Sequence, residues 1–518
     1  MILVSPPVAK PCEPPAGITR LRGALHSHGA RCKILDANVE GILSLLHGSH
    51  TPTDTWTQRA SRSLSLHLAS LRSWPTYGHL ARYRRAVLDL NRILEMAAIS
   101  RGIHVGLANY QHPQLSPLKS VDLIRAAESP EENPFYPYFR KRLPQVLDED
   151  SPSVIGFSLN YLSQALCTFA MIGFLKRHCP GVKLVLGGGL VTSWMKRPSW
   201  QNPFRGLVDF LVAGPGEDPL LTMMNIQTGT GEIHSLPDYD SLPVEDYFAP
   251  GRILPYSSSS GCYWNRCSFC PEKAEGNPYT PIPVDRVTLD LNTLIKKMKP
   301  ALVHLLDNAI PPALMEKIAD QPLGVPWYGF ARISRHLTDL NFCLALKKSG
   351  CVLLQLGLES GDPGVLDEMQ KGIDLEMASR SLEVLKQAGI ATYVYLLFGT
   401  PTETRSAARR TLDFAVQHHE QIHFLNLAIF NLPVSGPEAQ KVQTKKFYEG
   451  DLTLYTNFSH PKGWSRNLVR QFLDREFKRH PAIVPILRRD PPIFTSNHAP
   501  FFVMDEPVTA WESGALQG

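Results

Sequence analysis

Residues 257–270 read Ser-Ser-Ser-Ser-Gly-Cys-Tyr-Trp-Asn-Arg-Cys-Ser-Phe-Cys, and this stretch decides how the chain is interpreted. Cys262, Cys267 and Cys270 fall within nine residues at C-x4-C-x2-C spacing, directly after the apolar run Ile253–Tyr256. The whole chain of 518 residues contains nine cysteines, so three on one short loop stand out. Three thiols gathered on a loop that begins with glycine predict a metal centre.

The number of ligands indicates which metal centre this is. A structural zinc site uses four ligands, and no second cysteine pair is present, because Cys343 and Cys351 lie eight residues apart in apolar contexts. An iron–sulfur cube held by three thiolates leaves one iron open to another ligand. We therefore predict a [4Fe–4S] cluster; the alternatives are zinc with a distant fourth ligand such as His304, or unrelated cysteines.

Composition limits the class of protein. The chain is 43% apolar with a formal net charge of +5 and no long basic run, so nothing favours nucleic acid as a partner. No apolar run reaches the roughly 18 residues that span a bilayer, and Met1–Val4 reads as a short strand rather than a signal peptide. An odd number of cysteines in a long chain argues against a disulfide framework. We expect a cytoplasmic protein.

The first part of the chain alternates between strands and helices. Apolar runs at 2–4, 33–35, 153–159, 183–186 and 208–212 predict strands, and helical patterns separate them. Such alternation predicts a doubly wound parallel sheet, with ligands bound at the carboxyl ends of its strands. Those ends carry 36–41, Ser158, 187–189 and 214–217. Residues 51–150 break this rhythm, and we interpret them as a helical insertion in a domain spanning 1–232.

A second series of β/α units follows a Pro-rich linker at 233–251. Strands are expected at 252–257, 301–307, 326–333, 352–359, 391–398 and 424–431, with helices between them. Six consecutive units predict a partial (β/α)6 barrel over 252–435, whose active site lies at the carboxyl ends of the strands. The cysteine loop follows the first of these strands. Residues 436–518 read as a small accessory region.

These motifs resemble those of the radical S-adenosylmethionine (SAM) enzymes. The resemblance rests on the cysteine loop, on Leu356-Gly-Leu-Glu-Ser-Gly361 and on Leu397-Phe-Gly-Thr-Pro-Thr-Glu-Thr404. The usual family spacing is C-x3-C-x2-C, so this chain has one extra residue, and we expect a wider loop at Tyr263 and Trp264. The resemblance implies a cluster held by the three cysteines and SAM bound to its open iron. It implies SAM contacts from Phe269, Asp307, Asn308, Arg332, Glu359 and Ser360.

The first domain resembles the cobalamin-binding domain that often precedes such a barrel. Asp36-Ala-Asn-Val-Glu-Gly41 stands where those domains can carry D-x-H-x-x-G, with Asn38 in place of the histidine that ligates cobalt. Gly156–Ala165 and the glycine turn at 187–189 match the rest of that pattern. We therefore expect no protein histidine on the lower face of cobalamin. The implied cobalamin contacts are Asp36, Asn38, Gly41, Ser158, Gly187, Gly188, Gly189 and Glu217.

Together these resemblances imply a cobalamin-dependent radical SAM enzyme that transfers a methyl group to an unactivated carbon of a small molecule or peptide. An electron donor such as flavodoxin or ferredoxin is an implied partner. The alternatives are a radical SAM enzyme of non-methylating type, or a cobalamin or iron–sulfur sensor without enzymatic activity. A methylthiotransferase is disfavoured, because Cys12, Cys32, Cys167 and Cys179 do not form a second cluster in the sequence.

Overall fold

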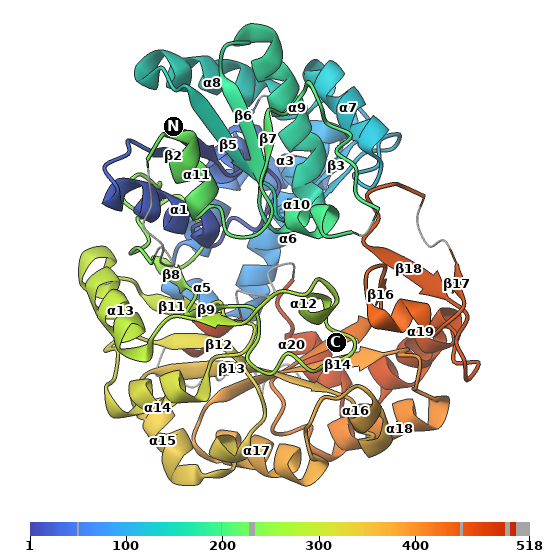
Figure 1. Cartoon of the computed structure of the whole chain (residues 1–518). Helices are drawn as coiled ribbons and strands as arrows, with labels where there is room; N and C mark the ends of the chain where they lie inside the picture. The colour runs from blue at the N-terminus through green and yellow to red at the C-terminus, as the bar shows by residue number, and fades with distance from the viewer. Residues whose placement is uncertain (49–50, 198, 227–233, 446–448, 493–497, 504–518) are drawn as a thin grey trace.

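A computed structural model describes residues 1–48, 51–197, 199–226, 234–445, 449–492 and 498–503. Its first half contains a parallel five-stranded sheet in the order β2-β1-β5-β6-β7 (Figure 1). The strands are β1 (Ile2–Val4), β2 (Lys33–Leu35), β5 (Val154–Ser158), β6 (Lys183–Gly187) and β7 (Phe210–Leu211). Helices α1 (Ala16–Ser27), α2 (Ala37–Leu46), α9 (Leu162–His178), α10 (Gly189–Met195) and α11 (Glu217–Met223) connect or follow them. The strand order reverses between β1 and β5, which is the position where such sheets bind ligands.

The insertion predicted at 51–150 is mainly helical. It contains α3 (Thr55–Arg62), α4 (Leu64–Leu71), α5 (Trp74–Tyr77), α6 (Leu80–Ile99), α7 (Ser120–Glu128) and α8 (Tyr136–Asp150), with a small hairpin of β3 (His104–Val105) and β4 (Tyr110–Gln111). Apolar residues of these helices share one buried core with strands β5 and β6 and with helix α9. The insertion therefore belongs to the body of the first half.

The second half is built on a six-stranded parallel sheet in the consecutive order β15-β14-β13-β12-β11-β8. Its strands are β8 (Ile253–Tyr256), β11 (Leu302–Leu305), β12 (Trp327–Ala331), β13 (Cys351–Glu359), β14 (Ala391–Phe398) and β15 (Phe424–Ile429). Helices α13 (Val284–Met298), α14 (Pro312–Asp320), α15 (Leu340–Lys348), α17 (Leu375–Gln387) and α18 (Arg405–Gln417) lie along its outer side (Figure 1). The predicted α/β class and the partial barrel are confirmed.

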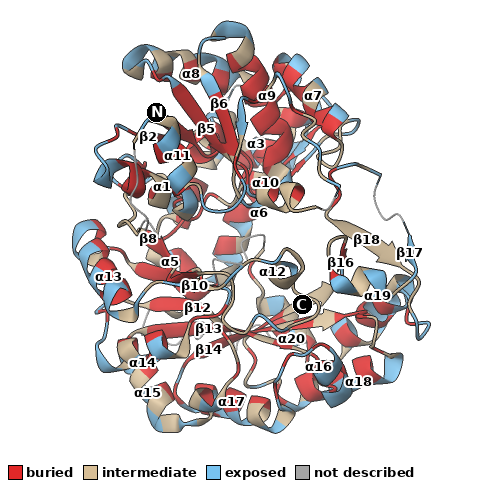
Figure 2. Ribbon diagram, in the orientation of Figure 1, coloured by how far each residue is buried: buried red, intermediate tan, exposed pale blue. Residues whose placement is uncertain are grey.

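The two faces of this sheet differ in burial. Along β14, Val394 and Leu396 are buried against the outer helices, whereas Tyr395 and Leu397 on the other face are partly exposed. Because successive strand residues point to opposite faces, this alternation identifies the inner face as open to solvent. Figure 2 shows the same mixture of buried and partly exposed positions along the lower strands.

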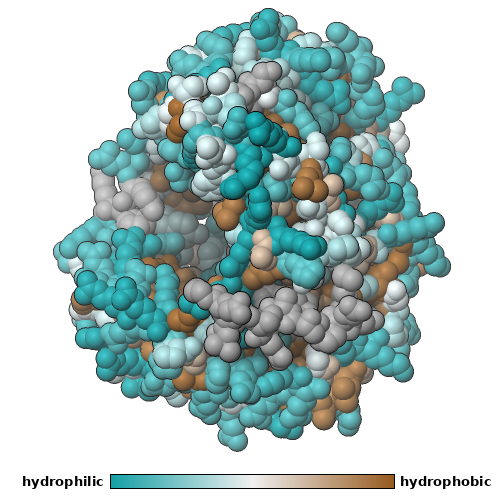
Figure 3. Space-filling view, turned by 180° about the vertical axis from the view of Figure 1, so that it is seen from behind, coloured by the Kyte–Doolittle hydropathy of each residue, from teal (hydrophilic) through white to brown (hydrophobic). Residues whose placement is uncertain are grey.

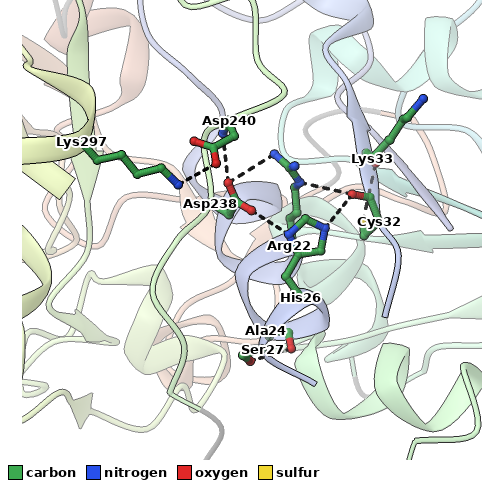
Figure 4. A network of polar contacts seen from close by, with 9 residues as sticks. All are labelled: Arg22, Ala24, His26, Ser27, Cys32, Lys33, Asp238, Asp240 and Lys297. Atoms are coloured by element: carbon green, nitrogen blue, oxygen red, sulfur yellow. Dashed lines mark hydrogen bonds and ion pairs between the residues drawn. The ribbon is translucent and has the colours of Figure 1, made fainter. Parts of the chain in front are cut away.

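The linker ties the two halves together (Figure 4). Asp238 accepts a hydrogen bond from His26 Nδ1 of α1 at 2.8 Å and pairs with Arg22 at 3.4 Å. Two residues later, Asp240 pairs with Lys297 of α13 at 2.6 Å. Asp238 is partly buried, which raises its pKa, but its hydrogen bonds and the nearby cations outweigh burial and the pKa is lowered. The linker is therefore an ordered element that contacts α1 on one side and α13 on the other.

The C-terminal region lies beside the open end of the barrel. Strands β16 (Leu432–Pro433), β17 (Thr444–Lys445) and β18 (Tyr455–Phe458) form a small antiparallel sheet, and α19 (Arg466–Arg475) and α20 (Val484–Arg489) follow. The rear surface is mostly hydrophilic with scattered apolar side chains (Figure 3). None of the helices in the described ranges is long and apolar enough to cross a bilayer.

Candidate functional site

The cysteine loop is held at its base by Asp307, which follows β11. The buried Asp307 carboxylate accepts hydrogen bonds from Ser258 Oγ at 2.7 Å and from Ser259 Oγ at 2.5 Å. Its second oxygen accepts the backbone N–H of Ser258 at 3.2 Å. Burial raises the pKa of Asp307, and these three donors oppose that shift. The residue predicted to bind SAM is thus occupied in fixing the strand-to-loop junction.

Glycine is required where the loop leaves β9 (Ser259–Ser260). Gly261 has φ +72°, and a side chain there would place Cβ 2.3 Å from the Pro278 carbonyl oxygen. The Asn308 side chain donates a hydrogen bond to the Gly261 carbonyl at 3.1 Å and is itself exposed. Asn308 therefore lies beside the cysteines, as the sequence predicted.

Trp264 supports the middle of the loop. The guanidinium of Arg332 stacks 3.8 Å from its ring centroid, and Arg266 lies over the ring at 5.1 Å. Its indole N–H donates to the Gln370 carbonyl at 3.0 Å. A Cβ on Gly372 would lie 2.3 Å from the Trp264 ring, so glycine there makes room for it. The segment between Cys262 and Cys267 that is one residue longer than usual is therefore the segment that contains Trp264 and its contact with Arg332.

The three cysteine thiols suit an iron–sulfur cluster in number and environment. All three are partly exposed and free of disulfides. Burial raises the pKa of Cys267 and of Cys270, and the charge of a neighbouring cysteine of the loop raises each pKa further. Within the residues that the structure describes, no three His, Cys, Asp or Glu side chains are gathered closely enough to hold a metal ion. The donor set fits a cluster, and its thiols would have to draw together around it.

Glu359 ends β13 at the mouth of the barrel. It has φ +69°, an uncommon conformation for a residue with a side chain, and the strand pairing is irregular there. Its carboxylate pairs with Lys371 Nζ at 2.8 Å. Both charged groups lie over Gly357, where an added Cβ would come within 2.7 Å of Glu359 Oε1. The irregular strand pairing and the absence of a side chain at Gly357 together allow this ion pair to lie over the inner face of the sheet.

The other two predicted SAM contacts differ in position. Phe269 packs with Val365, Met369 and Ala407, and Lys371 Nζ lies 5.6 Å from its ring. Ser360 is fully buried, and its hydroxyl lies 3.2 Å from Thr411 Oγ1. The structure therefore brings Arg332 to the cysteine loop, to which Phe269 itself belongs, and leaves Ser360 in the packing behind it.

A cavity of about 930 Å³ separates the two halves next to this loop. Its upper wall is formed by the carboxyl ends of β5 and β6 and by the start of α11. Its lower wall is formed by Ser259–Gly261, by α12 (Pro271–Ala274) and by the loop to β10 (Thr280–Pro281). Residues of the C-terminal sheet, among them Tyr455, close one side. Its volume is typical of a site for a sizeable organic ligand.

Five of the predicted cobalamin contacts line this cavity: Ser158, Gly187, Gly188, Gly189 and Glu217. Gly188 has φ +106°, and a Cβ there would lie 2.5 Å from the Leu159 carbonyl oxygen. The glycine turn therefore allows strand β6 to reach helix α10 without a side chain in the cavity wall. Glu217 is buried and pairs with Arg20 at 2.7 Å.

The other three, Asp36, Asn38 and Gly41, lie away from the cavity. Asp36 caps α2 by accepting the N–H groups of Asn38 and Val39, and it accepts the Tyr247 hydroxyl at 2.6 Å. Burial raises its pKa to about 6. Asn38 bonds through both atoms of its amide to the backbone of Ala9. The reason is topological: β2 is an edge strand, one strand away from the reversal point between β1 and β5.

Several cavity residues had no distinguishing sequence signal. Asn160 accepts the Gly189 N–H through Oδ1 at 2.9 Å and so fixes the glycine turn. Ser193 donates to Glu275 at 2.6 Å, joining α10 of the first half to the loop after α12. Glu275 and Asn277 are single polar residues in a loop. Their position depends on how the two halves meet, and no local spacing could predict it.

Comparison with known proteins agrees with this geometry. The radical SAM superfamily profile matches residues 256–415, which include the cysteine loop and strands β9 to β14. The chain is 28% identical over 192 residues to an uncharacterized methyltransferase of Pyrococcus horikoshii, matching 35% of this chain and 40% of that protein. It is 25% identical over 257 residues to the bacteriochlorophyllide d C-12(1)-methyltransferase of Chlorobaculum tepidum, matching 46% and 55%. The chain thus spans about half the length of these relatives or less.

Two solved structures share the fold across both halves. The cobalamin-dependent SAM radical enzyme OxsB, with aqua-cobalamin and SAM bound, aligns with a TM-score of 0.56 and 12% identity over 91% of this chain and 66% of that one. The radical SAM methyltransferase TsrM from Kitasatospora setae, with tryptophan and a SAM analogue bound, aligns with a TM-score of 0.53 and 14% identity over 95% and 89%. Residues 256–415 therefore match the radical SAM superfamily, and the chain shares its fold with these two cobalamin- or SAM-binding enzymes.

Proposed function

We propose that the chain is a cobalamin-dependent radical SAM methyltransferase that acts on an unactivated carbon. The observation that carries this proposal is the cavity of about 930 Å³, which lies between the carboxyl edge of the first sheet and the residues that flank the three cysteines, Ser259–Gly261 and Pro271. A cofactor in that cavity would face the loop directly. A sensor would not require an open inner face in the barrel, which the chain has.

The chain offers a set of residues for each cofactor of this reaction. When bound, the reduced cluster supplies an electron that cleaves SAM to methionine and a 5′-deoxyadenosyl radical, and cobalamin carries the methyl group. Cys262, Cys267 and Cys270 would hold the cluster. Ser158, the Gly187–Gly189 turn and Glu217 would contact cobalamin.

SAM would be positioned by residues around the barrel mouth. Glu359 can accept hydrogen bonds from the ribose hydroxyls, because its carboxylate lies on the inner face and Lys371 holds one of its oxygens. Arg332 uses part of its guanidinium on the carbonyl oxygens of Lys371 and Gly372 and can still meet a carboxylate. Asn308 offers its amide oxygen beside Gly261. Phe269, packed on apolar neighbours, would help to keep water from this region.

The remaining predicted residues take structural parts in this proposal. Asp307 orients the loop, and Ser360 anchors the start of α16 (Pro363–Glu368) by accepting the Asp362 N–H at 3.1 Å. Asp36 and Asn38 order the first half at a distance from the cavity. The electron would come from a donor protein of the flavodoxin or ferredoxin class.

One experiment tests the reaction. The protein is purified without oxygen, the cluster is reconstituted, and dithionite and SAM are added. We expect 5′-deoxyadenosine from the wild type and none from Cys262→Ala, whereas Cys351→Ala, a buried cysteine of the outer core, should retain activity if it folds. Absence of the product from wild type contradicts radical chemistry altogether. Product without a cobalamin absorption spectrum contradicts methyl transfer and favours the non-methylating alternative.

A further inference from the structure

The inner face of the barrel carries polar and aromatic side chains that the proposed function has not used. Phe330 of β12, Tyr395 of β14 and Asn426 of β15 are partly exposed on that face. Neighbouring residues that point outward, such as Ala331, Val394 and Leu425, are buried. These inner positions therefore face a space that solvent reaches.

Gln355 of β13 lies among these residues and has an unsatisfied polar atom. Its side chain is 3% exposed, and its Nε2 donates to the Tyr395 hydroxyl at 3.3 Å. Its Oε1 is buried without a hydrogen-bond partner among the residues that the structure describes. A buried acceptor without a donor is costly, so native proteins seldom leave one unless a ligand or water completes it.

Aromatic residues of β12 and β14 flank Gln355 on the neighbouring strands. Phe330 and Gln355 are register partners, as are Gln355 and Tyr393. The rings of Phe330 and Tyr395 lie 5.0 Å apart, and those of Tyr393 and Tyr395 lie 4.7 Å apart. Such rings favour contact with a flat apolar group, and the amide adds one acceptor among them.

The position of Gln355 relative to the barrel mouth suits a substrate contact. On β13 the inward-facing residues run from Glu359 through Gly357 to Gln355, and Gly357 carries no side chain. The Glu359–Lys371 pair lies directly over Gly357. Gln355 is the next residue on the same face, about 7 Å further in. A molecule bound beneath SAM would meet it there.

We propose that Gln355 Oε1 accepts a hydrogen bond from the substrate, and that the substrate has a flat apolar body bearing an N–H or O–H donor. This inference rests on the proposed function, because it takes the inner face of the barrel as the substrate site. Gln355 is then a specificity-determining residue, with Phe330 and Tyr395 forming the apolar walls.

Two probes that differ in one donor test the inference. Equilibrium dialysis of the reconstituted protein with SAM would compare 2-naphthol with 2-methoxynaphthalene, which lacks the O–H. Wild type should bind 2-naphthol about tenfold more tightly, since a hydrogen bond to a buried partner contributes about 1.4 kcal/mol. Gln355→Leu should bind both probes equally, and Gln355→Glu, which keeps an acceptor, should retain the preference. Equal affinities in wild type overturn the proposal.

The stability of the free protein gives a second readout. Gln355→Leu removes the unsatisfied acceptor at similar volume, so its thermal unfolding midpoint should match or exceed that of wild type. A lower midpoint together with an unchanged preference for 2-naphthol would show a purely structural role and overturn the inference. The proposed function fails separately, because 5′-deoxyadenosine formation with dithionite and SAM needs neither probe.

Discussion

The guanidinium of Arg332 lies 3.8 Å from the ring centroid of Trp264, and it also donates to the carbonyl oxygens of Lys371 and Gly372. One side chain thus connects the end of strand β12, the cysteine loop and the segment after α16. A cation over an indole ring contributes about 2 kcal/mol when it is shielded from water. This contact holds the cysteine loop in place even though the loop is one residue longer than usual.

Trp264→Ala should weaken cluster retention. Loss of the stacking contact, about 2 kcal/mol, favours displaced loop conformations by about 30-fold. We expect less iron per chain after reconstitution and gel filtration, and a smaller cluster absorption band. Trp264→Phe keeps an aromatic ring but loses the indole N–H, so its iron content should lie between those of Trp264→Ala and wild type.

Arg266→Ala is the matched control for that experiment. Arg266 lies on the exposed side of the Trp264 ring at 5.1 Å, where water weakens the interaction. Its iron content should stay close to that of wild type. If Trp264→Ala retained iron as well as Arg266→Ala does, the supporting role of Trp264 would be refuted.

Glu403 should make stability depend on pH. It is fully buried after β14 and accepts hydrogen bonds from the Gly399 N–H and from Trp464 Nε1. Burial raises its pKa to about 7, so the folded state holds a proton that the unfolded state releases near pH 4.5. Its stabilising contribution is complete below pH 4.5 and declines by about 3 kcal/mol as pH rises to about 7.

Glu403→Gln checks this, because glutamine does not titrate and can accept the same two donors. The difference in unfolding midpoint between Glu403→Gln and wild type should grow in favour of glutamine from pH 4.5 to pH 7 and then level off. Glu368→Gln, on the exposed surface of α16, is the control. A difference that does not change with pH would mean that Glu403 is ionised throughout this range.

Gly188→Ala should distort the upper wall of the cofactor cavity. The added Cβ would lie 2.5 Å from the Leu159 carbonyl in a backbone conformation with φ +106°. We expect a lower unfolding midpoint and loss of cobalamin from the purified protein, measured by its visible absorption. Gly181→Ala, where a Cβ meets nothing within 4 Å, should bind cobalamin normally. Normal binding by Gly188→Ala would place cobalamin elsewhere.

Asn38→His should leave the spectrum of bound cobalamin unchanged. The Asn38 amide is held by Ala9, and the residue is 4% exposed outside the cavity wall. Asn160→His, in the cavity wall between β5 and β6, is the positive comparison and should shift the cobalt absorption bands. A shift of the cobalt absorption bands in Asn38→His alone would contradict the placement of Asn38 outside the cobalamin site.

Much of the architecture was predictable because it depends on local patterns. The six strands of the barrel follow apolar runs, and the predicted 391–398 matches β14 residue for residue. The cysteine loop and the Gly187–Gly189 turn were recognised from spacing and from glycine content. In each case the information lies within a few consecutive residues.

The parts that the sequence did not predict depend on tertiary placement. The Asp36–Gly41 motif follows a strand, yet that strand lies at the edge of the sheet, and strand order cannot be read from an apolar run. Asp307 stands at a strand end as a SAM contact should, but the two serines that occupy it lie 49 and 48 residues away. Glu359 pairs with Lys371 because the strand pairing is irregular at the end of β13, and Arg332 reaches the Gly372 carbonyl because Gly372 leaves room for Trp264. Neither contact could be predicted from local sequence.

The composite wall of the cavity also bears on biosynthesis. Leu3 and Tyr455 line the same cavity, so its wall is incomplete until residue 455 has left the ribosome. N-terminal segments fold first during synthesis, and the five-stranded sheet can form long before its opposite wall exists. A ligand can therefore be enclosed between the two halves only after Tyr455 has been synthesised, and a chain truncated before that residue would lack one side of the cavity wall.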